Sequence, residues 1–142
     1  MTTQQIDLIR TTWKLAAANA DTVGPLFYET LFEIAPELKP MFSRTTVPEQ
    51  SKKLLAMLSY VISKLDSLGD ILDEVAKLAR RHVNYGVEDK HYGYVGAALL
   101  MTLEKGLGNA WNDEVKDAWT TCYGILSSAM MNAAGYAEQR AA

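Results

Sequence analysis

Apolar residues recur every three or four positions along almost the whole chain, which is the spacing of one face of an α-helix. No segment shows the strict alternation of apolar and polar residues that is typical of a half-buried β-strand. The pattern therefore predicts an all-α protein, with about six long helices joined by short connections and short helical turns.

Capping signals place the ends of the first two helices. Thr2 and Gln5 have the spacing of a capping box at the start of the first helix. Asp21 or Thr22 can cap the second helix. Either cap leaves Pro25 in the first turn, where a proline is tolerated.

Breakers and caps also divide the second half of the chain. Pro48 is predicted to open the third helix, and residues 68–70 to end it. Gly86 suits the end of the next helix, and Asn112 the start of the last. The polar, alanine-rich segment after Gly135 is predicted to fray.

The helix before Gly86 carries an apolar stripe that ends in an imidazole. The stripe consists of Leu72, Val75, Leu78 or Ala79, and His82. A buried imidazole needs a hydrogen bond or a metal, and a core histidine with a hydrogen-bond partner is the alternative to a ligand. With one other histidine and one cysteine, the chain cannot build an ordinary metal site. A metal at His82 would have to bring most of its own ligands, as haem iron does.

Composition narrows the class of protein. A length of 142 residues with 49% hydrophobic content fits one soluble domain over residues 1–142. A net charge of −3 argues against a general nucleic-acid binder. Cys122 is the only cysteine, so no intramolecular disulfide can form. Because no secretory signal or bilayer-length apolar run is present, we expect a cytoplasmic protein without a membrane partner.

Six residues in a fixed order carry a family resemblance. They are Tyr28, Phe42, Gln50, Leu54, His82 and Tyr92. With this set, the chain resembles the globin family, above all single-domain bacterial globins and the flavohaemoglobin and neuroglobin-like branches. The resemblance implies a three-over-three helical fold that encloses haem b. That haem would be held non-covalently, because no Cys-x-x-Cys-His motif is present.

The resemblance also assigns the proximal side of the site. It implies that His82 ligates the iron through one ring nitrogen, while the other donates a hydrogen bond. Phe42 would wedge the macrocycle, and Lys53 and Arg81 would pair with the propionates unless they are plain surface charges. Leu54 would form an apolar wall above the iron, and Tyr92 is a further expected haem contact. Leu78, Val87 and Val95 are expected to line the pocket, although general core packing would also explain them.

Tyr28 and Gln50 are the expected distal pair. Bound dioxygen carries partial negative charge, so a phenol donor aimed at it would slow its escape. Gln50 offers both a donor and an acceptor, and can act on the ligand or orient Tyr28. The alternatives are a core tyrosine and an exposed glutamine. Glutamine is a poor iron ligand, so an open sixth position for a gas is expected.

One position departs from the flavohaemoglobin pattern. A glutamate there joins the proximal network, whereas this chain carries Ala134, so peroxidase-like chemistry is not expected. The predicted function is reversible binding of dioxygen, carbon monoxide and nitric oxide. The first alternative is nitric oxide dioxygenation, which would need a separate reductase because the chain ends before a flavin domain. Gas sensing is the next alternative, and a helical bundle without haem is the last. The oligomeric state stays open.

Four other side chains are not expected to act on the iron or its ligand. His91 is expected to be exposed or near a propionate, and the following three are expected only to pack in the core: Trp13, Trp119 and Tyr123.

Overall fold

The computed structural model describes residues 1–135, and these contain six α-helices, three short 3-10 helices and no strand. The α-helices are α1 (Thr3–Ala17), α2 (Ala20–Ile34), α3 (Val47–Ser63), α4 (Leu72–Asn84), α5 (Asp89–Leu107) and α6 (Asp113–Ala133). The 3-10 helices are η1 (Pro36–Phe42), η2 (Leu68–Ile71) and η3 (Gly108–Ala110). The prediction of an all-α fold is confirmed. The predicted fraying after Gly135 lies outside the described residues.

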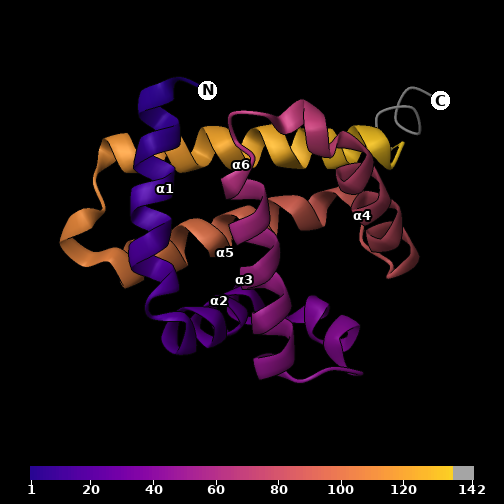
Figure 1. Ribbon diagram of the computed structural model, residues 1–142. Coiled ribbons are helices and arrows are strands. Elements are labelled where there is room, and N and C mark those ends of the chain that lie inside the picture. The colour runs from indigo at the N-terminus through magenta and orange to yellow at the C-terminus, as the bar shows by residue number, and fades with distance from the viewer. Residues whose placement is uncertain (136–142) are drawn as a thin grey trace.

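The helices cross in two layers around one main core. Helices α5 and α6 lie side by side, and α1 and α3 run across them (Figure 1). Helix α2 packs on both α5 and α3, while α4 packs on α6. The largest fully buried side chains are Ile9, Thr30, Leu31, Thr102, Leu103, Val115 and Trp119.

The predicted helix starts are partly confirmed. Thr2 Oγ1 accepts from the Gln5 amide at 3.1 Å, and Gln5 Oε1 accepts from the Thr2 amide at 3.0 Å. The predicted cap of α2 was wrong. The helix begins at Ala20, with Asn19 rather than Asp21 or Thr22 at the N-cap position. The Asn19 carbonyl already accepts from the amides of Thr22 and Val23, both at 2.9 Å. Pro25 consequently lies beyond the first turn, inside the helix.

The apolar stripe before His82 also needs a correction. Val75 and Ala79 are buried as predicted, but the Leu72 side chain is 57% exposed. Leu72 is the first residue of α4, directly after η2. The preceding residue, Ile71, is 2% exposed and fills the inward position instead. The change from 3-10 to α geometry shifts the stripe by one residue.

Trp13 and Trp119 have polar partners as well as the predicted packing role. Their rings lie 6.1 Å apart, centroid to centroid. The Trp13 indole donates to Ser59 Oγ at 3.0 Å, and the Trp119 indole donates to Thr12 Oγ1 at 2.9 Å. Cys122 is buried beside them in the main core, and burial raises the pKa of its thiol to about 11.

We expect Gly24→Ala to destabilise the protein, because α2 and α3 cross at this residue. A Cβ at Gly24 would lie 2.6 Å from Ser51 Cβ and 2.8 Å from Ser51 Oγ. The helices would have to separate, which typically costs about 1–3 kcal/mol of unfolding free energy. Urea unfolding followed by circular dichroism measures the loss.

Gly93→Ala is the matched control for this substitution. Gly93 also lies inside a helix, but a Cβ there meets nothing within 4 Å. Alanine is a better helix former than glycine by about 1 kcal/mol, so this variant should be as stable as the wild type or more so. Equal stability of the Gly24 and Gly93 variants would show that the α2–α3 crossing tolerates separation.

Candidate functional site

His82 lies in the last turn of α4, and its ring is fixed by a hydrogen bond within that helix. Nδ1 of His82 lies 2.8 Å from the carbonyl oxygen of Leu78. A carbonyl oxygen can only accept, so Nδ1 carries the proton in this arrangement. In the neutral ring Nε2 then holds a lone pair, which is the form in which imidazole binds a metal. The hydrogen bond expected from the second ring nitrogen is therefore present.

The chain turns back beside His82 at a glycine. Gly86 has a φ of 87°, a left-handed conformation that favours glycine and ends α4. The Val87 amide then donates to the His82 carbonyl at 3.0 Å. The same turn carries Tyr85, whose ring centroid lies 6.2 Å from that of His82.

Tyr28 is buried in an aromatic cluster, with 3% of its surface exposed. Its ring centroid lies 5.0 Å from Phe27 and 5.5 Å from Phe42. The structure thus brings together Tyr28 and Phe42, which are 14 positions apart in the sequence. Phe32 completes the cluster, with its ring centroid 5.6 Å from that of Phe42. Burial raises the pKa of Tyr28 to about 12, and the nearby Gln50 offsets only part of that rise. At neutral pH the phenol is protonated and can donate.

Gln50 lies beside Tyr28 because α2 and α3 cross closely. The Tyr28 hydroxyl lies 3.4 Å from the main-chain carbonyl of Gln50, which is long for a hydrogen bond. Next along α3, the Ser51 hydroxyl is buried and has no hydrogen-bond partner among the described residues. Gly24 allows this approach, as its missing Cβ leaves room for Ser51. Tyr28 therefore has a donor that its own surroundings satisfy poorly.

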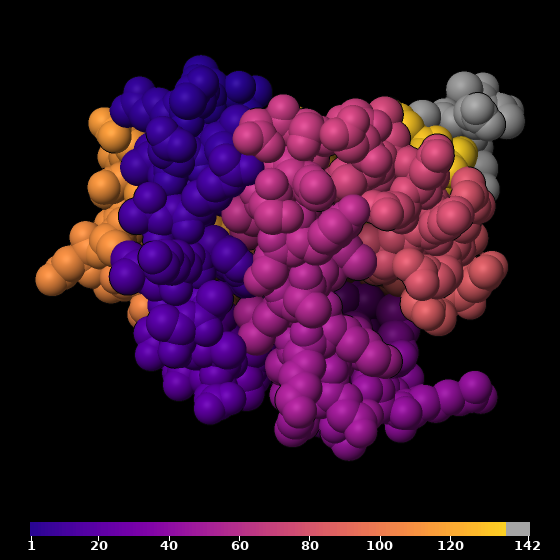
Figure 2. Space-filling model, in the orientation of Figure 1, coloured from indigo at the N-terminus to yellow at the C-terminus, as the bar shows by residue number. Residues whose placement is uncertain are grey.

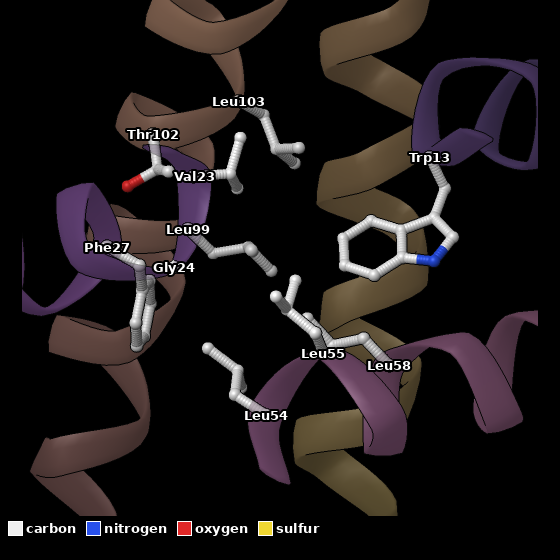
Figure 3. Close-up of a pocket in the computed structure, with 10 residues that line it drawn as sticks. All are labelled: Trp13, Val23, Gly24, Phe27, Leu54, Leu55, Leu58, Leu99, Thr102 and Leu103. Atoms are coloured by element: carbon white, nitrogen blue, oxygen red, sulfur yellow. The ribbon is translucent and has the colours of Figure 1, made fainter. Parts of the chain in front are cut away.

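Leu54 lies one helical turn after Gln50 and borders a small apolar cavity of about 10 Å³. Figure 3 shows the ten residues around this space, which come from α1, α2, α3 and α5. The two polar groups in the wall face elsewhere, since Thr102 donates to Ala98 and the Trp13 indole to Ser59. The cavity has room for roughly one water-sized molecule and offers it no hydrogen bond. The cavity therefore leads from Leu54 toward core residues such as Leu99 and Leu103.

Helices α3 and α4 are joined at one end and separate toward the other. The Tyr60 hydroxyl on α3 donates to Glu74 Oε2 on α4 at 2.5 Å. Gln50 lies roughly 15 Å from Tyr60 along α3, and His82 roughly 12 Å from Glu74 along α4. Toward that end the two helices make little contact, and the surface between them is hollowed (Figure 2).

The chemistry of this opening fits haem. A buried phenol donor lies on α2, with only a long hydrogen bond to the Gln50 carbonyl. On α4, the hydrogen bond at Nδ1 of His82 leaves its other ring nitrogen, Nε2, with no hydrogen-bond partner found within residues 1–135. The expected apolar contacts keep part of their surface uncovered, as a planar apolar group would require. They are Phe42, Leu54, Leu78, Val87 and Val95. Lys53 and Arg81 are exposed, as propionate partners or surface charges would be, and Tyr92 is buried.

The environments of His91 and Tyr123 differ from those expected from the sequence. His91 is buried rather than exposed, and its Nδ1 accepts from the Glu88 amide at 2.9 Å, so it caps the start of α5. Tyr123 does more than pack, because its hydroxyl donates to the Tyr92 carbonyl at 2.6 Å. Its ring occupies the space that a Cβ at Gly96 would need. The linear pattern gave no signal for either contact.

Neither a metal-binding cluster nor a membrane-spanning helix is found within residues 1–135. No group of three or more His, Cys, Asp or Glu side chains there could hold a metal ion. No described helix has the length and apolar character to cross a membrane.

Comparison with known proteins identifies relatives for most of the chain. Residues 26–130 match the sequence model of the globin family. A neuroglobin from Danio rerio is 32% identical over 136 residues, which cover 87% of this chain and 86% of that protein. A flavohemoprotein from Bacillus subtilis is 28% identical over 129 residues, covering 89% of this chain but 32% of that protein. The chain thus spans about a third of the flavohemoproteins it matches.

A solved structure has the same fold over nearly its whole length. The bacterial globin from Campylobacter jejuni superposes with a TM-score of 0.83 at 27% identity. The match covers 97% of this chain and 99% of that one.

Proposed function

This chain belongs to the globin family, and from that premise we propose that it binds one haem b and uses it to bind dioxygen reversibly. Carbon monoxide and nitric oxide would compete for the same position. The observation that carries the proposal is the hydrogen bond from His82 Nδ1 to the Leu78 carbonyl, which leaves Nε2 available for iron. The buried Tyr28 donor on α2 would then act on the gas from the distal side.

Each side of the site has a separate task. The Leu78 carbonyl holds the His82 ring in the tautomer that presents Nε2, so His82 would be the proximal ligand. Phe42, Leu54, Leu78, Val87, Tyr92 and Val95 would hold the macrocycle, with Lys53 and Arg81 near its propionates. When bound, haem would supply an iron with one open position for a gas.

The distal residues would select among gases by hydrogen bonding. Tyr28 can donate from a dry, aromatic surrounding, in which a hydrogen bond is stronger than in water. Gln50 cannot replace a histidine as a strong iron ligand, so its amide would orient Tyr28 or donate a second hydrogen bond. A diatomic ligand with partial negative charge is held longer by these donors than an apolar one.

Titration of the purified protein with haem tests this proposal. We expect a Soret band that saturates at one haem per chain, and a reduced form whose spectrum changes reversibly with dioxygen and with carbon monoxide. A protein that develops no Soret band, or a reduced form that binds neither gas, would contradict it.

Gln50→Leu should accelerate dioxygen release about two- to fivefold, less than loss of the Tyr28 hydroxyl. Removing a supporting donor costs a fraction of one hydrogen bond, roughly 0.5–1 kcal/mol. Stopped-flow displacement of dioxygen by carbon monoxide measures the rate. Glu49→Gln is the control, because Glu49 is exposed in the same turn of α3. A Gln50 variant that releases dioxygen at the wild-type rate would remove Gln50 from the distal site.

Nitric oxide dioxygenation is a second candidate function. The Tyr28 donor beside Gln50 favours it, since retained dioxygen is available to react, and the similarity to flavohemoproteins points the same way. Dioxygen, nitric oxide and one electron give nitrate, so turnover needs a reductase as the electron source. Rapid mixing of the dioxygen form with nitric oxide should yield nitrate and the ferric protein within milliseconds. Continued nitrate production with a flavin reductase would identify an enzyme, and a single turnover would leave a binding protein.

A further inference from the structure

Positive charge is concentrated in two segments of this acidic chain. Residues 38–53 and 76–90 contain eight of the 14 lysines and arginines but three of the 17 acidic residues. The rest of the chain is strongly acidic, although the whole carries only −3. Such a separation of charge orients an approaching charged molecule.

The fold brings these two segments to the same opening. The Met41 side chain lies against Gly86, where its Cε is 3.8 Å from the position of an added Cβ. The first segment also contains Phe42 and Gln50, and the second contains His82, so both border the candidate site. We call their exposed cations the basic rim, leaving out Lys90, which pairs with Glu88. It comprises Lys39, Arg44, Lys52, Lys53, Lys77, Arg80 and Arg81.

The charges of the basic rim are not neutralised within the described protein. Two acidic residues of the same segments, Glu49 and Glu88, form no ion pair with a rim residue within residues 1–135. Glu88 pairs instead with Lys90 at 3.6 Å and approaches His91 at 3.8 Å. Seven exposed cations therefore lie on the two segments that border the candidate site.

An exposed aromatic side chain lies among these cations. Tyr85 is 65% exposed, and it follows Arg80 by five residues and Arg81 by four. Met41 and Val83 in the same region are also exposed. Tyrosine, arginine and methionine are enriched in protein interfaces, whereas a purely solvated face needs no exposed aromatic ring. The combination favours a protein partner.

We propose that the basic rim is the docking surface for an acidic flavoprotein that donates electrons to this chain. The inference rests on the proposed haem site, because Tyr85 places the surface beside His82, ring centroids 6.2 Å apart. A compact acidic protein contacts the rim alone, whereas an extended polyanion would also meet the acidic remainder of the chain. In the transfer the flavin loses one electron and the ferric haem gains it, with no bond formed or broken.

Charge reversal at matched positions tests this docking surface. The rim variant is Lys39→Glu, Arg44→Glu and Arg80→Glu, which leaves Lys53 and Arg81 intact. The control is Lys14→Glu, Lys105→Glu and Lys116→Glu, three exposed lysines elsewhere that give the same change in net charge. Binding of an acidic flavodoxin to the haem-loaded, carbon monoxide form is measured by calorimetry. At 0.15 M salt distant charges are largely screened, so only local ones should matter.

We expect the rim variant to weaken flavodoxin binding about tenfold or more, and the control to change it less than about twofold. Reduction of the ferric form by reduced flavodoxin should slow in parallel. Equal effects of both variants, or binding that does not weaken with salt, would overturn the proposal. So would loss of single-stranded RNA binding in the rim variant with flavodoxin binding unchanged. Carbon monoxide binding by both variants is measured separately, so a failure of docking is distinguishable from a failure of the haem site.

Discussion

Replacing His82 with alanine is expected to lower the affinity of the protein for haem by a factor on the order of 100 or more. Loss of a residue that merely orients a metal ligand costs about 10- to 100-fold, and loss of the ligand itself costs more. The substitution removes the Nε2 lone pair and the bond to Leu78, while the buried face of α4 keeps Val75 and Ala79. Transfer of haem to apomyoglobin, followed by absorbance, measures the change.

His91→Gln is the control for this prediction, because His91 is the only other histidine. Its imidazole caps α5 through the Glu88 amide, a role that a glutamine oxygen can fill, so haem affinity should stay near the wild-type value. Added imidazole should restore the spectrum of a His82→Gly protein, which shows that the fold survives. A His82→Ala protein that retains haem as tightly as the wild type would exclude His82 as the ligand.

Replacing Tyr28 with phenylalanine is expected to accelerate dioxygen release roughly tenfold or more. The substitution removes one buried donor and keeps the ring contacts with Phe27 and Phe42, so packing changes little. A hydrogen bond to a partly charged acceptor is worth about 1.5 kcal/mol, which corresponds to that factor. Stopped-flow displacement of dioxygen gives the rate, and autoxidation should rise with it.

Tyr60→Phe is the matched control for Tyr28. Tyr60 is exposed on α3 and donates to Glu74, away from the distal side. Its loss should leave the dioxygen rate within about twofold of the wild type. A larger effect would mean that the α3–α4 link near Tyr60 governs the site more than the Tyr28 donor does.

Helical periodicity predicted the helices because burial of one face decides where each helix can lie. Their ends depend on local choices that periodicity does not resolve. At the start of α2 two caps were plausible, yet Asn19 begins the helix because its carbonyl reaches two amides at once. Similarly, η2 turns Ile71 inward and Leu72 outward, a shift that follows from 3-10 geometry and is invisible in the spacing.

The site residues were predicted as an ordered set, but most contacts among them required the fold. The resemblance implied that the second ring nitrogen of His82 donates a hydrogen bond, but only the structure identified its acceptor, the Leu78 carbonyl. The close approach of Gly24 and Ser51 joins two helices, and it sets the position of Gln50 beside Tyr28. Nothing in the linear pattern marks such a crossing. The charges of the basic rim were likewise visible only as short clusters until the fold placed them at one opening.

The central claim is that His82 and Tyr28 form the two sides of one gas-binding site, and the dissociation rates of two gases test it most directly. Dioxygen and carbon monoxide release should both be measured on the wild type and on Tyr28→Phe. Bound carbon monoxide carries less negative charge, so the loss of the phenol donor should accelerate dioxygen release several times more than carbon monoxide release. Equal acceleration of both gases, or no change in either, would contradict the claim.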